Sequence, residues 1–326
     1  MSEPPEPTKK KRALPRWLDR VFLLVGLVLL AYVLSRYPLR DLLAGCARLG
    51  PWVATTPLVA MLWFACNTTA LHRLLERRVS WLALFRIRLI GDGYNALLPL
   101  AGFGGEPFMV KHLSTWLPVD QVLTARVRDR VIENAVGYLY TGTWLGLAAL
   151  SHRFALPRAL VIGIVGYAIF AAIVGGASLA VVATTLPGRA SARVAKWLGL
   201  DAGGASAIPL GELAWLLLIY FGARIAGTLE AFVLFRLLGL GSDLLSIAFT
   251  YSLLSAAGFL GFAIPAGIGV FEGTTIYLFE LLGFPGPIGV AYALARRGRM
   301  LVVGLAGVAL HLLLGLGGER KQIDKP

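Results

Sequence analysis

This chain contains several apolar runs that are about as long as a membrane-spanning helix. Few classes of fold are compatible with such runs. An α-helix needs about 20 mostly apolar residues to cross the hydrocarbon core of a bilayer. The run at 21–35 has the length of a signal-peptide core, but no small-residue cleavage motif follows it, so we interpret it as a retained helix. We predict full spans at residues 21–35, 52–71, 131–150, 159–186, 213–238 and 300–316.

The composition places the chain in the membrane class. Hydrophobic residues make up 57% of its 326 residues and charged residues only 15%, whereas a soluble domain carries about 25% charged residues. So much apolar surface requires lipid rather than water as its solvent. We therefore predict an all-α integral membrane protein.

The excess of basic residues also has a membrane explanation. Thirty-one lysines and arginines against eighteen acidic residues give a net charge of +13. Basic cytoplasmic loops and attraction to anionic lipid head groups account for such a charge. We therefore expect membrane lipids, and not nucleic acid, as partners. The oligomeric state is left open, with a homo-oligomer as one option.

The cysteines and histidines give no signal for a metal or a cofactor. Cys46 and Cys66 lack the spacing of a metal site, and the four histidines are scattered along the sequence. We therefore expect no metal and no cofactor.

Two further segments, 81–117 and 244–283, are apolar but broken by prolines and glycines near their centres. The first also carries the charged residues Arg88 and Asp92. Charged groups at the bilayer centre cost about 2.5–3.5 kcal/mol each, so these arms would be poor lipid-facing spans. We predict two re-entrant helical hairpins buried among the other helices, because irregular backbone at membrane depth needs protein or water around it.

These segments predict one membrane domain, 21–317, between a basic tail at 1–20 and a short tail at 318–326. With six full spans both tails lie in the cytoplasm. Three spans separate the two hairpins, so the hairpins enter from opposite sides, as in the inverted repeats of many carriers. Counting every hairpin arm as a full span gives ten spans instead, and this alternative stays open.

A weak internal repeat agrees with the inverted arrangement. In each half a proline is followed seven residues later by a glutamate and then, 24 residues after that, by an arginine. Overall identity between the halves is near chance, so the prediction rests on how rare these residue types are in apolar sequence. At an offset of 166 residues the identities are Pro99/Pro265, Glu106/Glu272, Ala125/Ala291 and Arg130/Arg296.

The broken centres of the hairpins are the first candidate site. Pro99 would end a helix, and Gly104 and Gly105 would permit close backbone approach before the next helix. The first N–H groups of that helix would then face an anionic head group. The alternative is a tight turn that Glu106 caps, and Asn95 would bind either freed carbonyls or a substrate. The corresponding residues of the second hairpin are Pro265, Gly267 and Gly269.

Glu106 and Glu272 are the second part of the candidate site, because a carboxylate within the bilayer is a functional hypothesis by default. At 100° per residue Arg126, Arg130 and Glu133 share one helix face. We expect these arginines, with Arg296 and Arg299 after the second hairpin, to neutralise a phosphate. The glutamates would hold the arginines or accept a proton. A structural ladder of salt bridges is the alternative.

Two more charged residues, Arg224 and Glu230, lie inside the predicted span 213–238. Six residues apart, they point about 240° from one another around a helix. We expect both to lie in the bundle interior with different partners.

At these residues the chain resembles the lysylphosphatidylglycerol synthase transmembrane family of flippase-like membrane proteins. The resemblance covers roughly residues 18–317 and implies an inner-membrane protein that moves a lipid between leaflets. We expect no aminoacyl transferase domain of the kind that accompanies this region in the multiple-peptide-resistance factor, and so no transfer of lysine from tRNA. The blocks that carry the resemblance are Gly91-Asp-Gly-Tyr-Asn95-Ala-Leu-Leu-Pro99, Gly104-Gly105-Glu106 and Pro265-Ala-Gly267-Ile-Gly269-Val-Phe-Glu272.

We therefore predict a lipid flippase or related carrier, not an enzyme. No nucleotide-binding motif is visible, so a gradient would supply any energy, or transport is passive. One alternative is an intramembrane lipid-modifying enzyme with Glu106 as general base. Another is a non-catalytic partner of a lipid-synthesis complex.

Overall fold

The described part of the chain is helical apart from its connecting turns. The computed structural model describes residues 39–97, 105–154, 156–183, 207–241, 243–260 and 269–314, and no strand occurs among them. The predicted all-α class is confirmed for these residues. The elements are α2 (Leu39–Leu49), η1 (Pro51–Ala54), α3 (Thr55–Leu74), α4 (Trp81–Leu97), α5 (Glu106–Leu113), α6 (Val119–Leu150), α7 (Arg158–Ala183), α9 (Leu210–Leu237), α10 (Leu244–Leu260), α11 (Val270–Leu281) and α12 (Gly286–Leu314).

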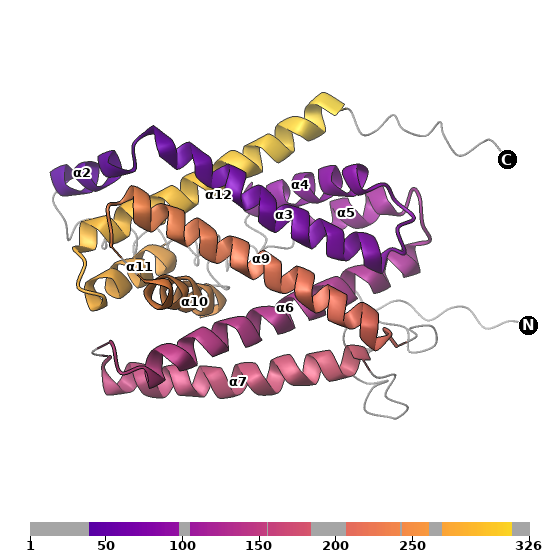
Figure 1. Cartoon of the computed structure of the whole chain (residues 1–326). Coiled ribbons are helices and arrows are strands. Elements are labelled where there is room, and N and C mark those ends of the chain that lie inside the picture. The colour runs from indigo at the N-terminus through magenta and orange to yellow at the C-terminus, as the bar shows by residue number, and fades with distance from the viewer. Residues whose placement is uncertain are drawn as a thin grey trace, which may run out of the picture.

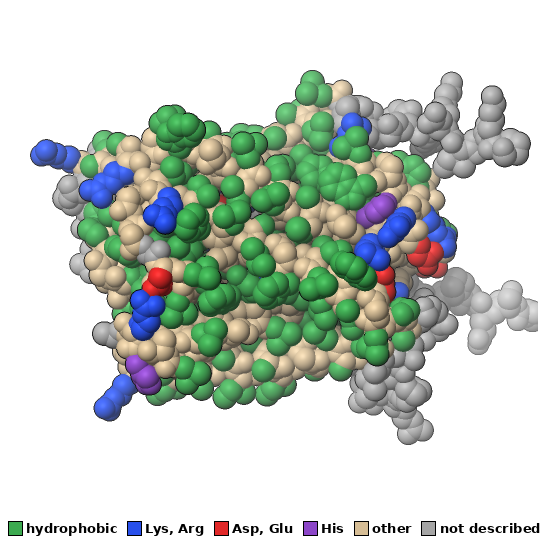
Figure 2. All heavy atoms as spheres, viewed as in Figure 1, with side chains coloured by type: hydrophobic (Ala, Val, Ile, Leu, Met, Phe, Trp, Pro, Cys, Tyr) green, Lys and Arg blue, Asp and Glu red, His purple; other side chains and the backbone are tan. Residues whose placement is uncertain are grey.

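Three described helices are long and apolar enough to cross a membrane by length and composition. They are Pro51–Leu74, Arg158–Ala183 and Leu210–Leu237, at the predicted spans 52–71, 159–186 and 213–238. The predicted span 21–35 lies outside the described residues. Hydrophobic side chains cover the middle of the bundle, and most charged side chains on the visible face lie toward its two ends (Figure 2). This distribution is that of a multi-pass membrane protein.

Two helices are longer than predicted. α6 runs unbroken from Val119 to Leu150 and α12 from Gly286 to Leu314, whereas the predicted spans began at residues 131 and 300. The charged residues before those positions therefore lie within long helices and not at their starts. A charge indicates the end of a span only where it would face lipid, and ion pairing inside the protein removes that constraint.

The two broken segments each form a pair of helices, α4 with α5 and α10 with α11, which we call the first and the second hairpin. The pair α4 and α5 lies toward one end of the bundle, and α10 and α11 lie toward the other end (Figure 1). Residues 98–104 and 261–268, which join the arms, lie outside the described residues.

The helix bounds repeat at the offset of 166 residues. Shifted by this amount, α6 would run from 285 to 316, against 286–314 for α12. The ends of α4 and α5 fall within three residues of those of α10 and α11. The internal repeat is therefore much stronger in the order and length of the helices than in residue identity.

The packing of the repeats is reciprocal. α4 of the first repeat packs on α12 of the second, while α10 of the second packs on α6 of the first. Glycines bring α4 and α12 close: a Cβ atom at Gly93 would lie 2.7 Å from the carbonyl oxygen of Gly304, and one at Gly307 would lie 2.4 Å from that of Leu89. Small residues of this kind allow membrane helices to approach closely. α3 and α9 pack on one another.

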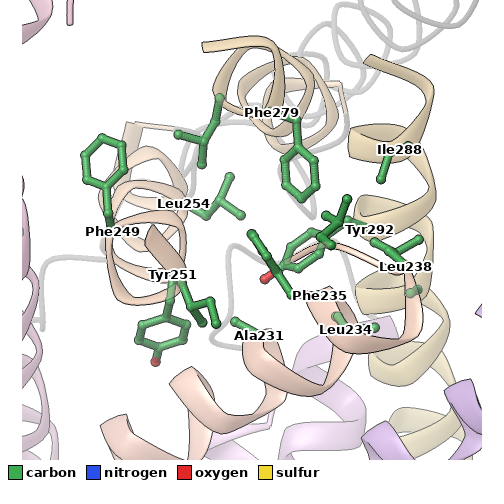
Figure 3. Packing of buried hydrophobic residues seen from close by; sticks show 14 of the residues in the cluster. Ala231, Leu234, Phe235, Leu238, Phe249, Tyr251, Leu254, Phe279, Ile288 and Tyr292 are labelled. Carbon is green, nitrogen blue, oxygen red and sulfur yellow. The ribbon is translucent and has the colours of Figure 1, made fainter. Parts of the chain in front are cut away.

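An aromatic core fixes the second hairpin against its neighbours. Phe235 from α9, Phe279 from α11 and Tyr292 from α12 are almost fully buried and lie around one centre (Figure 3). The ring centroids of Phe279 and Tyr292 are 5.2 Å apart, and those of Phe235 and Tyr292 are 5.9 Å apart. Offset and edge contacts at these distances stabilise the packing beyond the apolar area that they bury.

Candidate functional site

The two arms of the first hairpin meet through backbone atoms. A Cβ atom at Gly105 would lie 1.8 Å from the carbonyl oxygen of Gly91 on α4, so only glycine fits there. The N–H of Gly105 donates to Oδ1 of Asn95 over 2.7 Å, and the Asn95 amide donates to Asp92 over 3.2 Å. Asn95 thus binds the start of α5 to the end of α4 by satisfying a backbone donor.

Glu106 begins α5 and accepts hydrogen bonds from two arginines of α6. Nη2 of Arg126 lies 2.8 Å and Nη2 of Arg130 lies 2.7 Å from its Oε1 atom. Arg126 also reaches Oε2 through Nε and Nη2, over 3.2 and 3.0 Å. The two arginines are one helical turn apart, which brings both to one carboxylate. The expected pairs of Glu106 with Arg126 and Arg130 are thus present.

The same face of α6 continues into a buried network that reaches α4 and α9. Nη1 of Arg88 on α4 lies 3.3 Å from Asp129 and its Nη2 lies 3.7 Å from Glu133. Tyr220 on α9 donates to the other oxygen of Asp129, and Arg130 binds Glu133 over 3.0 Å. The Arg88 side chain is 1% exposed and that of Asp129 is fully buried. These groups lie in the protein interior, where an unpaired charge would be very costly.

We call this network the first ion cluster. It holds three arginines and four carboxylates, and each arginine contacts at least one carboxylate. Its members are Arg88, Asp92, Glu106, Arg126, Asp129, Arg130 and Glu133.

The second hairpin places Glu272 in the first turn of α11. Gly269 precedes the helix with φ 81, and its N–H donates to Oε2 of Glu272 over 2.8 Å. Nε of Arg297 on α12 lies 2.7 Å from Oε1 of Glu272. Glu272 thus caps its own helix and also binds the next long helix. In the first hairpin these two contacts are made by different residues: Asn95 binds the N–H that precedes α5, and Glu106 binds α6.

The partners of the remaining arginines correct the sequence prediction. Arg297, which was not among the predicted residues, binds Glu272, while Arg299 binds Glu230 on α9 over 3.0 Å. Arg296 lies 4.0 Å from Glu230 and stands over the rings of Tyr251 and Phe271, with its Cζ atom 6.0 and 5.5 Å from their centroids. Adjacent residues differ by 100° around a helix, so the orientation of α12 selects Arg297 for Glu272.

We call this group the second ion cluster. It holds three arginines and two carboxylates, which are Arg296, Arg297, Arg299, Glu230 and Glu272. Its arginines have side-chain exposures between 18% and 20%, so this cluster is closer to the surface than Arg88 and Asp129.

The remaining predicted residues fall into two groups. Arg224 donates to the backbone carbonyl of Glu133 over 3.0 Å, while Glu230 binds Arg299, so the two have different partners as predicted. Pro99, Gly104, Pro265 and Gly267 lie outside the described residues.

Sequence reasoning missed Arg88, Asp129 and Tyr220 as parts of the site. Arg88 and Asp92 were visible as an i,i+4 pair of charges in an apolar segment, which was the available signal. The histidines are also less scattered than expected, because the rings of His112 and His311 lie 6.1 Å apart. Among the described residues no group of three or more His, Cys, Asp or Glu side chains has the geometry to hold a metal ion.

The chain matches a known family over most of its length. The chain belongs to the family of the lysylphosphatidylglycerol synthase TM region, whose model matches residues 20–307. This range agrees with the predicted extent of the resemblance and contains both ion clusters. No curated protein and no solved structure matches the chain.

Proposed function

Starting from this family membership, we propose that the protein moves a lipid with a polar or anionic head group between the two leaflets of the inner membrane. Family membership itself indicates lipid handling in a membrane. The proposed step beyond it is transport without chemical change of the lipid.

One observation carries the proposal. Two helix pairs related by an internal repeat lie toward opposite ends of the bundle (Figure 1). Each carries, in the first turn of its second helix, a glutamate bound to the next long helix. Inverted repeats with broken helices and buried charges near the bilayer midplane are typical of alternating-access carriers. We interpret the two pairs as re-entrant hairpins among six full spans, with both termini in the cytoplasm.

The ion pairs divide the bundle into parts that move as units. Glu106 binds α5 to α6, and Glu272 binds α11 to α12, so each returning arm stays with its own long helix. The contacts of α4 with α12 and of α10 with α6 contain no salt bridge among the described residues. α4 packs on α12 through glycines and one hydrogen bond, between Tyr94 and His311 over 2.6 Å. Packed helices slide on such surfaces at lower cost than buried ion pairs break. Rocking of one unit against the other would open a path first to one leaflet and then to the other.

The test is leaflet exchange by the purified protein. Proteoliposomes with a head-group-labelled fluorescent phospholipid are treated with a membrane-impermeant reductant, and the fraction of label that becomes accessible is followed with time. We expect faster exchange than in protein-free vesicles, for at least one of an anionic and a zwitterionic lipid. Exchange no faster than in protein-free vesicles for both would contradict the proposal. A chemically altered lipid recovered from the vesicles would indicate an enzyme instead.

A further inference from the structure

A cavity of about 340 Å³ lies among α6, α7, α9 and α10, and neither ion cluster accounts for it. Arg224 stands near the middle of the 28-residue helix α9 and Asn134 at the middle of the 32-residue helix α6. The cavity therefore lies close to half the length of these helices. Its lining includes Asn134, Gly137, Tyr138, Tyr167, Arg224 and Ser255.

Arg224 is the charged group of this cavity. Among the described residues no carboxylate lies within 4 Å of its guanidinium, whose Nη2 atom donates to the backbone carbonyl of Glu133 over 3.0 Å. α9 is apolar enough to span a membrane, and an arginine at the centre of such a helix is costly unless it faces a polar cavity or a partner. One carbonyl oxygen binds only part of the five N–H donors of a guanidinium, and it carries no negative charge to balance that of the arginine.

Helix α6, opposite Arg224, has a glycine at the position that the guanidinium contacts. A Cβ atom at Gly137 would lie 2.5 Å from Nη2 and 2.9 Å from Cζ of Arg224. Any larger residue at position 137 would therefore displace the guanidinium from its place in the cavity wall.

The cavity is open at the surface of the bundle. Asn134 and Gly258, which both line it, are exposed. Phe170 on α7 is 41% exposed, and its ring contacts those of Tyr138 and Tyr167 at centroid distances of 5.8 and 6.3 Å. A head group in the cavity would thus have an apolar surface beside it for its acyl chains.

We propose that this cavity binds the phosphodiester group of an anionic phospholipid, with Arg224 pairing with the phosphate oxygens. A planar guanidinium matches a phosphate in two parallel hydrogen bonds. The hydroxyl and amide groups of Tyr138, Tyr167, Ser255 and Asn134 suit a neutral, hydroxylated head group, and the volume is at the small end for a ligand site. A head-group ammonium would face the positive charge of Arg224, so anionic lipids bind in preference to zwitterionic ones.

This inference rests on the proposed function and is tested without a bilayer. The full-length protein in an uncharged detergent is titrated with dihexanoyl phosphatidylglycerol by calorimetry, and dihexanoyl phosphatidylcholine and glycerol phosphate serve as comparison probes. We expect Arg224→Gln to weaken binding of the phosphatidylglycerol about tenfold or more, and Arg224→Lys to restore part of it. Arg236→Gln, at an exposed position of the same helix, is the matched control and should bind as the wild type does.

Gly137→Ala keeps the charge and displaces the guanidinium, so weaker binding by this variant also supports the site, even if Arg224→Gln fails to fold. Equal phosphatidylglycerol binding by the wild type and the folded variants would overturn it. Glycerol phosphate binding as tightly as the lipid would overturn the lipid assignment in favour of a free phosphate ester. If the protein exchanges lipid between leaflets but its phosphatidylglycerol binding does not depend on Arg224, this inference alone is refuted. If the binding depends on Arg224 but no leaflet exchange occurs, only the transport proposal is refuted.

Discussion

The two ion clusters occupy equivalent places in the repeats but differ in composition. The first ion cluster holds one carboxylate more than its arginines, and the second holds one arginine more than its carboxylates. In the second, the rings of Tyr251 and Phe271 stand under Arg296, and an aromatic face is a weaker partner for a cation than a carboxylate. The same helical framework therefore carries a tightly paired charge network in one half and a looser, cationic one in the other.

This difference indicates that the repeats have separate tasks. The first ion cluster ties α4, α5, α6 and α9 together around the buried pair of Arg88 and Asp129, while Glu106 and Arg130 at its α5 side are partly exposed. The second joins α9, α11 and α12, and none of its arginines is as deeply buried as Arg88. We infer that the first half is the more rigid support and that the second half is the part whose contacts change more readily.

The largest expected effect is at Asp129. Asp129→Asn would leave Arg88 without its nearest carboxylate, and removing one partner of a buried ion pair costs about 3–5 kcal/mol. Glu230→Gln in the second ion cluster should cost less, about 1–3 kcal/mol, because Arg299 is 20% exposed and can reach water. Unfolding of both variants by SDS in mixed micelles would measure the difference, and an equal or larger cost for Glu230→Gln would contradict the proposed contrast.

A smaller effect is expected at the glycines that precede the two glutamate helices. Gly105→Ala would place a Cβ atom 1.8 Å from a backbone oxygen, and overpacking of this kind costs about 1–3 kcal/mol or more. Gly269→Ala would instead require a non-glycine residue at φ 81, which costs about 1–2 kcal/mol.

Gly298→Ala on α12 is the matched control, because a Cβ atom there meets no atom within 4 Å. Melting temperatures in detergent should therefore fall most for Gly105→Ala, less for Gly269→Ala and not at all for the control. A melting temperature of Gly105→Ala equal to that of the wild type would show that the arms of the first hairpin do not meet as described.

The smallest expected change in stability is at an ion pair on the surface, outside both ion clusters. Asp243 accepts the backbone N–H of Ser246 over 2.8 Å and binds Arg153, and the hydrogen bond from Ser246 holds the pKa of this carboxyl below its ordinary value. A lowered pKa in the folded state adds stability at pH above the ordinary aspartate pKa, and this stability is lost as the pH falls through the lowered value.

Because the pair is exposed, Asp243→Asn should change the free energy of unfolding by at most about 0.5 kcal/mol at neutral pH. The difference from the wild type should disappear in acid. Unfolding curves measured across that pH range would check both points, and a difference that grows as the pH falls would contradict the sign.

Much of the fold could be predicted from local sequence. Apolar runs predicted the helices α3, α7 and α9, and the spacing of Arg126 and Arg130 predicted that both share a helix face with access to Glu106. These features depend on periodicity along one helix, which a single sequence displays.

The features that escaped prediction depend on how helices face one another. Arg88 on α4 meets Asp129 on α6 only through the tertiary arrangement of the two helices, and the choice of Arg297 over Arg296 depends on the rotation of α12. The predicted spans within the long helices α6 and α12 began too late, at residues 131 and 300, because the charges before them were interpreted as span ends. A charged residue does not indicate the end of a span where it forms an ion pair with a residue from another helix.

The central claim is that both hairpin glutamates are needed for lipid transport, and leaflet exchange by Glu106→Gln and Glu272→Gln tests it most directly. Asp243→Asn serves as the matched control for removal of a carboxylate outside the two clusters. Provided that all three variants fold, we expect each glutamate variant to slow exchange about tenfold or more, since each loses a charge-assisted contact between its hairpin and the next helix, while the control exchanges at the wild-type rate. Wild-type rates for both glutamate variants would contradict the claim.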